Sequence, residues 1–447
     1  MQEEFLHYLW KFRLFDGKYL LTQSGDPIEI LKVGESNSDS GPDFFNAKIK
    51  IGKTLWAGNV EIHVHASDWE AHKHQNDKAY DNVILHVVHE ADKELKRKNG
   101  EILPTLELKG KIPEGLYKKY LSFKESKDWI PCGKQVQIVS SFTLTHWFDR
   151  LLIERLERKT LPIIDSLSEN QNNWEETFYR HLAYGFGLKV NAQPFELLAK
   201  SLPLNILAKH KDSFLQIEAL LFGQAGMLDP SPSRLHSHPS PAARLSKGQR
   251  VPDDYFLQLQ KEYEFLKKKF KLKPIDSHLW KFMRLHPPNF PTIRIAQFAN
   301  LIYKSLHLFS KMIESTNIYT IRSLLHAESS EYWITHYRFG KSSPSRKKIL
   351  GEDTKNLLLI NTIVPFLFVY AKQKGEPQLM ERALDFLDKT EAERNSIIAK
   401  WNSLGIKSEN AYQTQALLQL KNEYCSKKRC LECEVGAKLL HPTSAVV

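Results

Sequence analysis

Two short stretches, residues 41–49 and 60–65, carry the most constraining pattern in this sequence. Both have the character of strands, in which successive side chains alternate between the two faces. Glu61 and His63 therefore share one face, while the valine and isoleucine residues between them point to the other. Asp43 stands at the head of the first strand. The pattern predicts a sheet that carries an ionisable stripe on one face, backed by an apolar face.

The turn between these strands decides whether Asp43 joins the stripe. We expect the turn near Gly52, and a three-residue loop would pair Ile51 with Leu55. Asp43 would then lie opposite His63, and directly paired residues share a face. A two-residue turn without a bulge would instead place Asp43 on the wrong face. The register of the hairpin therefore tests the hypothesis.

The rest of the chain separates into two kinds of structure. The elements expected early in the chain are a helix over residues 3–15, a strand over 28–33, the two strands above, a helix capped by Ser67 and Glu70, and strands over 83–88 and 102–109. From about residue 145 to 422 the pattern is almost wholly helical. We therefore expect an α/β domain over residues 1–135, a mainly helical domain over 136–420, and a cysteine-containing tail over 421–447.

The net charge of +11 favours an acidic partner, of which nucleic acid is the commonest. DNA is expected rather than RNA. Three lysine- and arginine-rich stretches could contact phosphates. Five residues from two of these stretches are the candidate phosphate contacts: Lys267, Lys268, Arg346, Lys347 and Lys348. Aromatic residues near the second stretch are expected to be buried in the helical core rather than stacked on bases.

Targeting patterns favour a cytoplasmic protein without a membrane anchor. The first residues lack the basic start and apolar run of a signal peptide. The most apolar stretch, residues 356–371, is interrupted by Asn361 and Pro365 and is short for a bilayer span, so we expect a buried helix. Four cysteines in a chain of 447 residues do not indicate a disulfide scaffold.

Asp43 and Glu61 suggest a site for a divalent cation. Two carboxylates on neighbouring strands are a minimal oxygen-ligand set for Mg²⁺ or Mn²⁺. His63, two residues after Glu61, could orient or deprotonate a water molecule at such a site. Phosphodiester hydrolysis of nucleic acid is therefore the leading hypothesis, with Asp43, Glu61 and His63 as catalytic residues. Glu4, on the first helix, is a further candidate carboxylate.

The region up to about residue 110 resembles the PD-(D/E)xK nuclease superfamily. The resemblance rests on Pro42-Asp43, on Glu61-Ile62-His63 and on the order helix, three strands, helix, strand. It implies a restriction-endonuclease-like fold. His63 replaces the lysine of the superfamily motif, and a neutral imidazole lacks the fixed positive charge of lysine beside a phosphate.

Other functions are compatible with the same residues. One is a non-catalytic nucleic-acid-binding protein that keeps the nuclease-like fold. Another is a zinc-dependent hydrolase built on histidines, for which the candidates are His63, His65, His72, His74, His86 and His89. If His72 and His74 lie on one helix, they do not share a face, which argues against that site. A half-exposed sheet face that only meets solvent is the plain structural alternative.

The cysteines suggest a second metal site. Cys425, Cys430 and Cys433 have C-x4-C-x2-C spacing, and Cys132 is the only other cysteine. Four thiolates are what zinc or a [4Fe–4S] cluster requires. The arrangement is similar to that of iron–sulfur nucleases of the same superfamily, although their lone cysteine precedes the nuclease motifs and Cys132 follows them. Free thiols in a basic tail are the alternative.

The chain also resembles, over nearly its full length, an uncharacterised bacterial family of unknown function. The residues that carry this resemblance are Gly41-Pro42-Asp43-Phe44, Val60-Glu61-Ile62-His63, Ser67-Asp68-Trp69 and the C-terminal cysteines. This resemblance implies no established activity.

Overall fold

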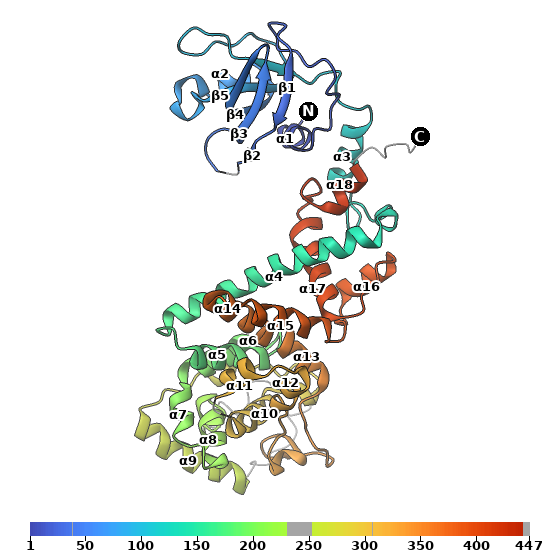
Figure 1. Cartoon of the computed structure of the whole chain (residues 1–447). Coiled ribbons are helices and arrows are strands. Elements are labelled where there is room, and N and C mark those ends of the chain that lie inside the picture. Colours follow the sequence, from blue (N-terminus) through green and yellow to red (C-terminus); the bar gives the residue numbers. More distant parts are fainter. Residues whose placement is uncertain (38, 230–252, 306, 441–447) are drawn as a thin grey trace. The chain divides into compact units, whose positions relative to one another are not determined.

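The computed structural model describes residues 1–37, 39–229, 253–305 and 307–440, which form two compact units. Unit 1 comprises Met1–Trp147, Ser403–Ile406 and Leu420–Val447, and unit 2 comprises Phe148–Asn402 and Lys407–Gln419 (Figure 1). The C-terminal segment therefore folds together with the N-terminal region. Residues 441–447 of the expected tail lie outside the described residues.

Unit 1 is built on a six-stranded mixed sheet with the order β1-β3-β4-β5-β6, and β2 also pairs with β3. The strands are β1 (Ile28–Lys32), β2 (Glu35–Ser36), β3 (Phe44–Ile51), β4 (Thr54–His65), β5 (Val83–Glu90) and β6 (Thr105–Glu107). β1, β3 and β4 pair antiparallel, whereas β4, β5 and β6 pair parallel. The first six residues of β5 are all buried, as expected for a strand covered on both faces.

In the described part of unit 1, four helices accompany the sheet. They are α1 (Glu3–Phe12), α2 (Asp68–Ala71), α3 (Leu116–Glu125) and α18 (Glu434–Leu440). α1 is shorter than expected because Arg13 adopts a left-handed conformation at φ 51° and ends the helix. The expected capping box at Ser67 is wrong, because its Oγ donates a 2.6 Å hydrogen bond to Asp92 instead of capping α2.

Unit 2 is almost wholly helical, which confirms the expected division into a mixed sheet followed by helices. Its helices are α4 (Ser141–Glu169, which starts in unit 1), α5 (Trp174–Phe186), α6 (Ala192–Ser201), α7 (Leu204–Ala208), α8 (Phe214–Gln224), α9 (Asp254–Phe270), α10 (Pro291–Lys304), α11 (Leu308–Glu314), α12 (Ile318–Leu324), α13 (Glu352–Leu358), α14 (Val364–Lys374), α15 (Pro377–Asp388), α16 (Ser396–Ser403) and α17 (Ala411–Gln419). A short hairpin, β7 (His336–Arg338) with β8 (Lys341–Ser342), lies among them. Leucine and phenylalanine side chains from most of these helices form one continuous core.

The most apolar stretch of unit 2 runs through α13 and α14, joined by the π-helical turn Leu359–Ile363. Pro365 follows this turn, and such bulges accommodate a residue that cannot donate an intrahelical hydrogen bond. Among the described helices, Glu352–Lys374 is the one long and apolar enough to cross a membrane, and 78% of its most apolar window is buried inside the protein. The expected burial of this stretch is confirmed.

Candidate functional site

Asp43 and Glu61 meet at the centre of the sheet of unit 1, but not by the expected register. The turn has two residues, because Ile51 pairs with Thr54, and Phe44 pairs with Val60. The pairing shifts by one residue between Phe44 and Ala47, which marks a β-bulge. The expected three-residue loop is therefore wrong, and the bulge is what turns Asp43 onto the face of Glu61.

The bulge requires an unusual backbone conformation within β3. Asn46 lies between the shifted pairs and has φ 56°, in the left-handed region. Asparagine tolerates this region better than most residues with a side chain. Asn46, three residues after Asp43, is therefore suited to the backbone conformation of the bulge.

The two carboxylates are held together by backbone hydrogen bonds. The Asp43 N–H donates to Glu61 Oε2 at 3.1 Å, and the Ile62 N–H donates to Asp43 Oδ2 at 2.9 Å. Glu61 is only 4% exposed. Burial, and then the charge of Asp43, raise the pKa of Glu61 to about 9. The site therefore disfavours two negative charges unless a cation is bound.

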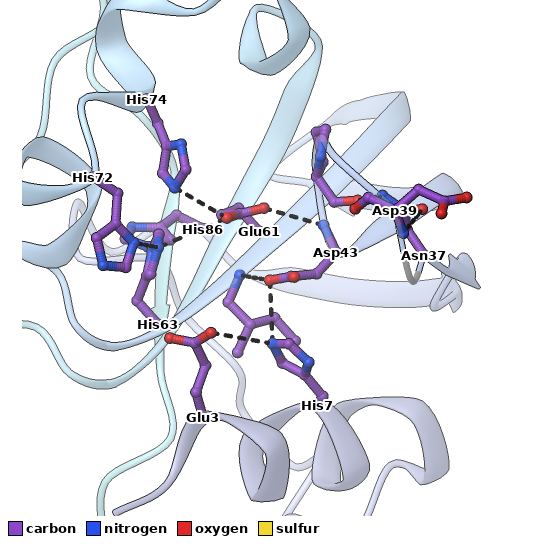
Figure 2. A network of polar contacts seen from close by, with 12 residues as sticks. Glu3, His7, Asn37, Asp39, Asp43, Glu61, His63, His72, His74 and His86 are labelled. Carbon is purple, nitrogen blue, oxygen red and sulfur yellow. Dashed lines mark hydrogen bonds and ion pairs between the residues drawn. The ribbon is translucent and has the colours of Figure 1, made fainter.

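Four histidines surround Glu61 and form the histidine cluster: His63, His72, His74 and His86 (Figure 2). His63 Nδ1 lies 2.8 Å from His86 Nε2, and His63 Nε2 lies 3.1 Å from His72 Nδ1. His74 Nε2 lies 3.3 Å from Glu61 Oε1, which is also 3.7 Å from His63 Nε2. The half-exposed sheet face considered above is excluded, because Glu61 and His63 are both buried.

A sharp break in the chain brings His72 and His74 to the same side. α2 ends at Ala71, His72 follows as its C-cap, and Lys73 adopts φ 65°. A new 3₁₀ turn, His74–Asn76, starts after this left-handed residue. The two histidines therefore do not occupy one helix, and the argument that helical spacing separates them is wrong. Their ring centroids are 5.5 Å apart.

These distances suit the coordination of one metal ion. The ligand atoms of His63, His72 and His74 lie within 4.8 Å of one another, the only such His, Cys, Asp or Glu group among the described residues. A tetrahedral ion with metal–nitrogen bonds of about 2.0–2.1 Å separates its ligand atoms by about 3.3 Å. The separations of 3.1, 3.3 and 3.7 Å among the three histidines and Glu61 bracket this value.

His63 is better placed as a metal ligand than as a base. Burial, and then the nearby His74 and His72, lower the pKa of His63 to about 3, so the ring is neutral at physiological pH. Its two ring nitrogens face His86 and His72. Burial also lowers the pKa of His86 well below its ordinary value. A neutral imidazole with one nitrogen held by a partner is the form in which histidine binds a metal.

A second pair, His7 and Glu3, reaches the site from α1 (Figure 2). His7 Nε2 lies 3.2 Å from Asp43 Oδ2 and 4.0 Å from Glu3 Oε1. Burial lowers the pKa of His7, but the hydrogen bond and charge of Asp43 outweigh it, and the net pKa is raised. Sequence reasoning missed this pair, although its i, i+4 spacing on the helix was a usable signal.

The other candidate acid on α1 lies in different surroundings. Glu4, considered above, pairs instead with Lys124 and bonds Tyr120. Glu3 is therefore the acidic residue of α1 that faces the histidine cluster.

The expected nucleic-acid contacts divide into exposed and buried residues. Lys267 and Lys268 lie in the last turn of α9, where Lys267 is half-buried and pairs with Glu264 at 3.8 Å. Arg346 and Lys347 are exposed. Lys348 is buried at 5% exposure, and its Nζ donates to the carbonyl oxygens of residues 334 and 346 at 2.8 and 3.2 Å. It therefore holds its own loop together and is not placed to contact phosphate.

The four cysteines lie in unit 1 and are all buried free thiols: Cys132, Cys425, Cys430 and Cys433. Trp333, with the neighbouring Phe339, packs in the core of unit 2 as expected.

Comparison with known families supports the resemblance to an uncharacterised family of unknown function. The model of the family described as "Protein of unknown function (DUF2851)" matches residues 3–396, which include the whole histidine cluster. The match ends before the three C-terminal cysteines. No curated protein and no solved structure matches the chain with significance. Because the match covers most of the sequence, the chain belongs to this family, DUF2851.

Proposed function

We propose that unit 1 is a metal-dependent hydrolase domain that cleaves phosphodiester bonds of nucleic acid. The observation that carries the proposal is the convergence of Glu61, His63, His72 and His74 beside Asp43. Five metal-binding side chains from three separate segments meet in one partly buried place. Their polar atoms approach one another at distances that a single divalent ion would bridge.

The arrangement of the sheet supports a nuclease-like fold. α1 is followed by the antiparallel strands β1, β3 and β4, and a segment containing α2 leads to β5, parallel to β4. Asp43 directly precedes β3, and Glu61 lies within β4. This is the arrangement that the resemblance to the PD-(D/E)xK superfamily implies, with β2 and β6 as additions.

The donor set favours a transition metal over Mg²⁺. Mg²⁺ prefers oxygen ligands and retains several waters, whereas imidazole suits zinc and related ions, and carboxylates suit Mn²⁺. Glu61 and three histidines combine both ligand types. We therefore infer Mn²⁺ or Zn²⁺ at this site. When bound, either ion would supply Lewis-acid polarisation of a phosphoryl oxygen.

The protein's own residues have distinct roles in this proposal. Glu61, His63, His72 and His74 would hold the ion, and His86 orients the His63 ring through His63 Nδ1. Asp43 and His7 are more accessible, with side chains 21% and 31% exposed. His7, whose Nε2 lies 3.2 Å from Asp43 Oδ2, can accept a proton from an attacking water molecule. The base is therefore assigned to His7, and not to His63.

A cleavage assay tests the proposal directly. The full chain, stripped with chelator and supplied with Mg²⁺, Mn²⁺ or Zn²⁺, is incubated with single- and double-stranded DNA and RNA. Asp43→Asn and Glu61→Gln remove the two carboxylates with little change in shape. Glu29→Gln, at an exposed position of β1, is the matched control.

Four results are distinguishable. Metal-dependent cleavage that both site variants abolish and Glu29→Gln retains would support a nuclease. Salt-sensitive binding without cleavage would support the alternative, a nucleic-acid-binding protein with a nuclease-like fold. Absence of both cleavage and binding would refute the nucleic-acid proposal. Activity with Zn²⁺ alone on other phosphate or acyl esters would favour the zinc hydrolase.

A further inference from the structure

The four cysteines of this chain, hereafter the cysteine group, gather in one part of unit 1. They are the only cysteines among 447 residues, and each is 6–9% exposed. None forms a disulfide. The cysteine group takes no part in the hydrolase site proposed above. All four are buried in one unit, although one lies in the N-terminal part of the sequence and three lie near the C-terminus, and this calls for a function of its own.

Contacts between distant segments bring Cys132 to the C-terminal cysteines. Lys421 Nζ donates to the Trp129 carbonyl oxygen at 2.9 Å and lies 5.1 Å from the centre of the Trp129 ring. Lys428 Nζ donates to the Lys124 carbonyl oxygen at 2.6 Å. These bonds fix the segment that contains Cys425 and Cys430 against the chain just before Cys132.

A tight turn brings Cys430 and Cys433 close together. The Cys433 N–H donates to the Cys430 carbonyl oxygen at 3.4 Å. Gly436 then packs so closely that an added Cβ would lie 2.1 Å from that same oxygen. A side chain at position 436 would therefore open the turn. The N–H groups of Val435 and Gly436 also donate hydrogen bonds to the Cys433 sulfur.

Electrostatic interactions among the thiols affect their pKa values. Burial, followed by Cys433 and Cys430, raises the pKa of Cys132 to about 12. Burial raises the pKa of Cys425 well above its ordinary value, with Cys433, Cys132 and Cys430 adding to the effect. Lys421 opposes the shift at Cys425, and Lys428 opposes it at Cys430. Two fixed positive charges thus lie where clustered thiolates would need them.

We propose that the cysteine group binds an iron–sulfur cluster through four thiolates. No three of the four sulfurs lie within 4.8 Å of one another, which is too wide for a single tetrahedral zinc ion but suits a cluster, whose ligands bind separate iron atoms. A [4Fe–4S] cluster takes four cysteine ligands, and the C-x4-C-x2-C segment with one distant cysteine supplies them. On binding, each thiol releases its proton and its sulfur bonds to metal. The centre joins the two ends of unit 1, Met1–Trp147 and Leu420–Val447, and so closes a very long loop.

Metal analysis of the full chain tests this inference. Protein purified without oxygen is analysed for zinc, iron and acid-labile sulfide, and its visible absorption is recorded. We expect about four iron and four sulfide ions per chain with a broad visible band, whereas zinc at the histidine cluster would give neither sulfide nor that band. Cys132→Ser and Cys430→Ser should each lower this content at least several-fold. Lys427→Ala, in the same loop but exposed and paired with Glu423 at 2.7 Å, should retain it.

Two further measurements make the result decisive. His72→Ala should keep the cysteine-bound metal, so a failure of the hydrolase site is distinguishable from a failure of this one. A mercurial reagent that binds thiols should release the metal from the unmodified protein, a result that does not depend on the folding of any variant. The proposal would be overturned if the protein as purified contains neither iron nor sulfide and all four thiols react with a thiol reagent in the native state. Metal content unchanged in both cysteine variants would do so as well.

Discussion

The protonation of Glu61 leads to a quantitative prediction of how metal affinity depends on pH. Burial and the neighbouring Asp43 raise its pKa to about 9 in the metal-free protein, so at pH 7 the carboxyl is protonated. A metal ion must displace this proton. Two units below the pKa only about 1% of the groups are ionised, so the apparent affinity at pH 7 is about 100-fold below its high-pH limit. Between pH 7 and 8 deprotonation of Glu61 raises the affinity about tenfold.

Whether metal affinity rises or falls with pH depends on which group holds the proton. His63 has a pKa of about 3, so it is neutral throughout this range and adds no competing proton. Metal affinity therefore increases with pH, and one proton is released from Glu61 for each ion bound near pH 7. Glu61→Gln cannot be deprotonated. It should bind more weakly than the wild type at pH 8 and lose this tenfold rise.

The assay is competition between the protein and a fluorescent chelator for Mn²⁺ at pH 6, 7 and 8. Calorimetry in two buffers of different ionisation enthalpy counts the released protons. Glu29→Gln, on the exposed side of β1, should follow the wild type. Wild-type affinity that stays constant from pH 6 to 8 would refute the reasoning. So would an equal pH dependence in Glu61→Gln.

Three further predictions concern the supporting structure. His86→Leu removes the partner that orients His63 and should weaken Mn²⁺ binding about 10–100-fold in the same competition assay, with an unchanged circular dichroism spectrum. Gly58→Ala places a methyl group 2.7 Å from a backbone oxygen just before β5 and should destabilise the protein by about 1–3 kcal/mol in urea unfolding; Gly17→Ala, with open space around it, should not. Lys347→Ala should lower the salt dependence of nucleic-acid binding by about one ion, whereas Lys348→Ala should lower the melting temperature, and the reverse pattern would contradict the assignment.

Much of unit 1 was predictable from local patterns. Alternating side chains in residues 60–65 identified β4 and placed Glu61 and His63 on one face. A continuous apolar run identified β5, and helical periodicity identified α1. These elements depend mainly on which side chains are apolar and at what spacing, and that information is local to the sequence.

The complete set of candidate ligands was not predictable in the same way. Asp43 reaches Glu61 through a bulge at Asn46, and His74 reaches it through the left-handed conformation of Lys73. A lysine carries no strong local signal for positive φ. His7 joins from a helix whose docking on β4 is decided by packing.

The sequence by itself determined the order of helices and strands, the two carboxylates that anchor the candidate site, and the four cysteines of the second proposed site. Only the tertiary structure decided that the histidines of β4, β5 and the segment after α2 enclose Glu61. It alone placed Cys132 in one unit with residues near the C-terminus. The reason is physical: periodicity records which side of an element is buried, whereas bulges, left-handed residues and long-range docking determine which buried sides meet.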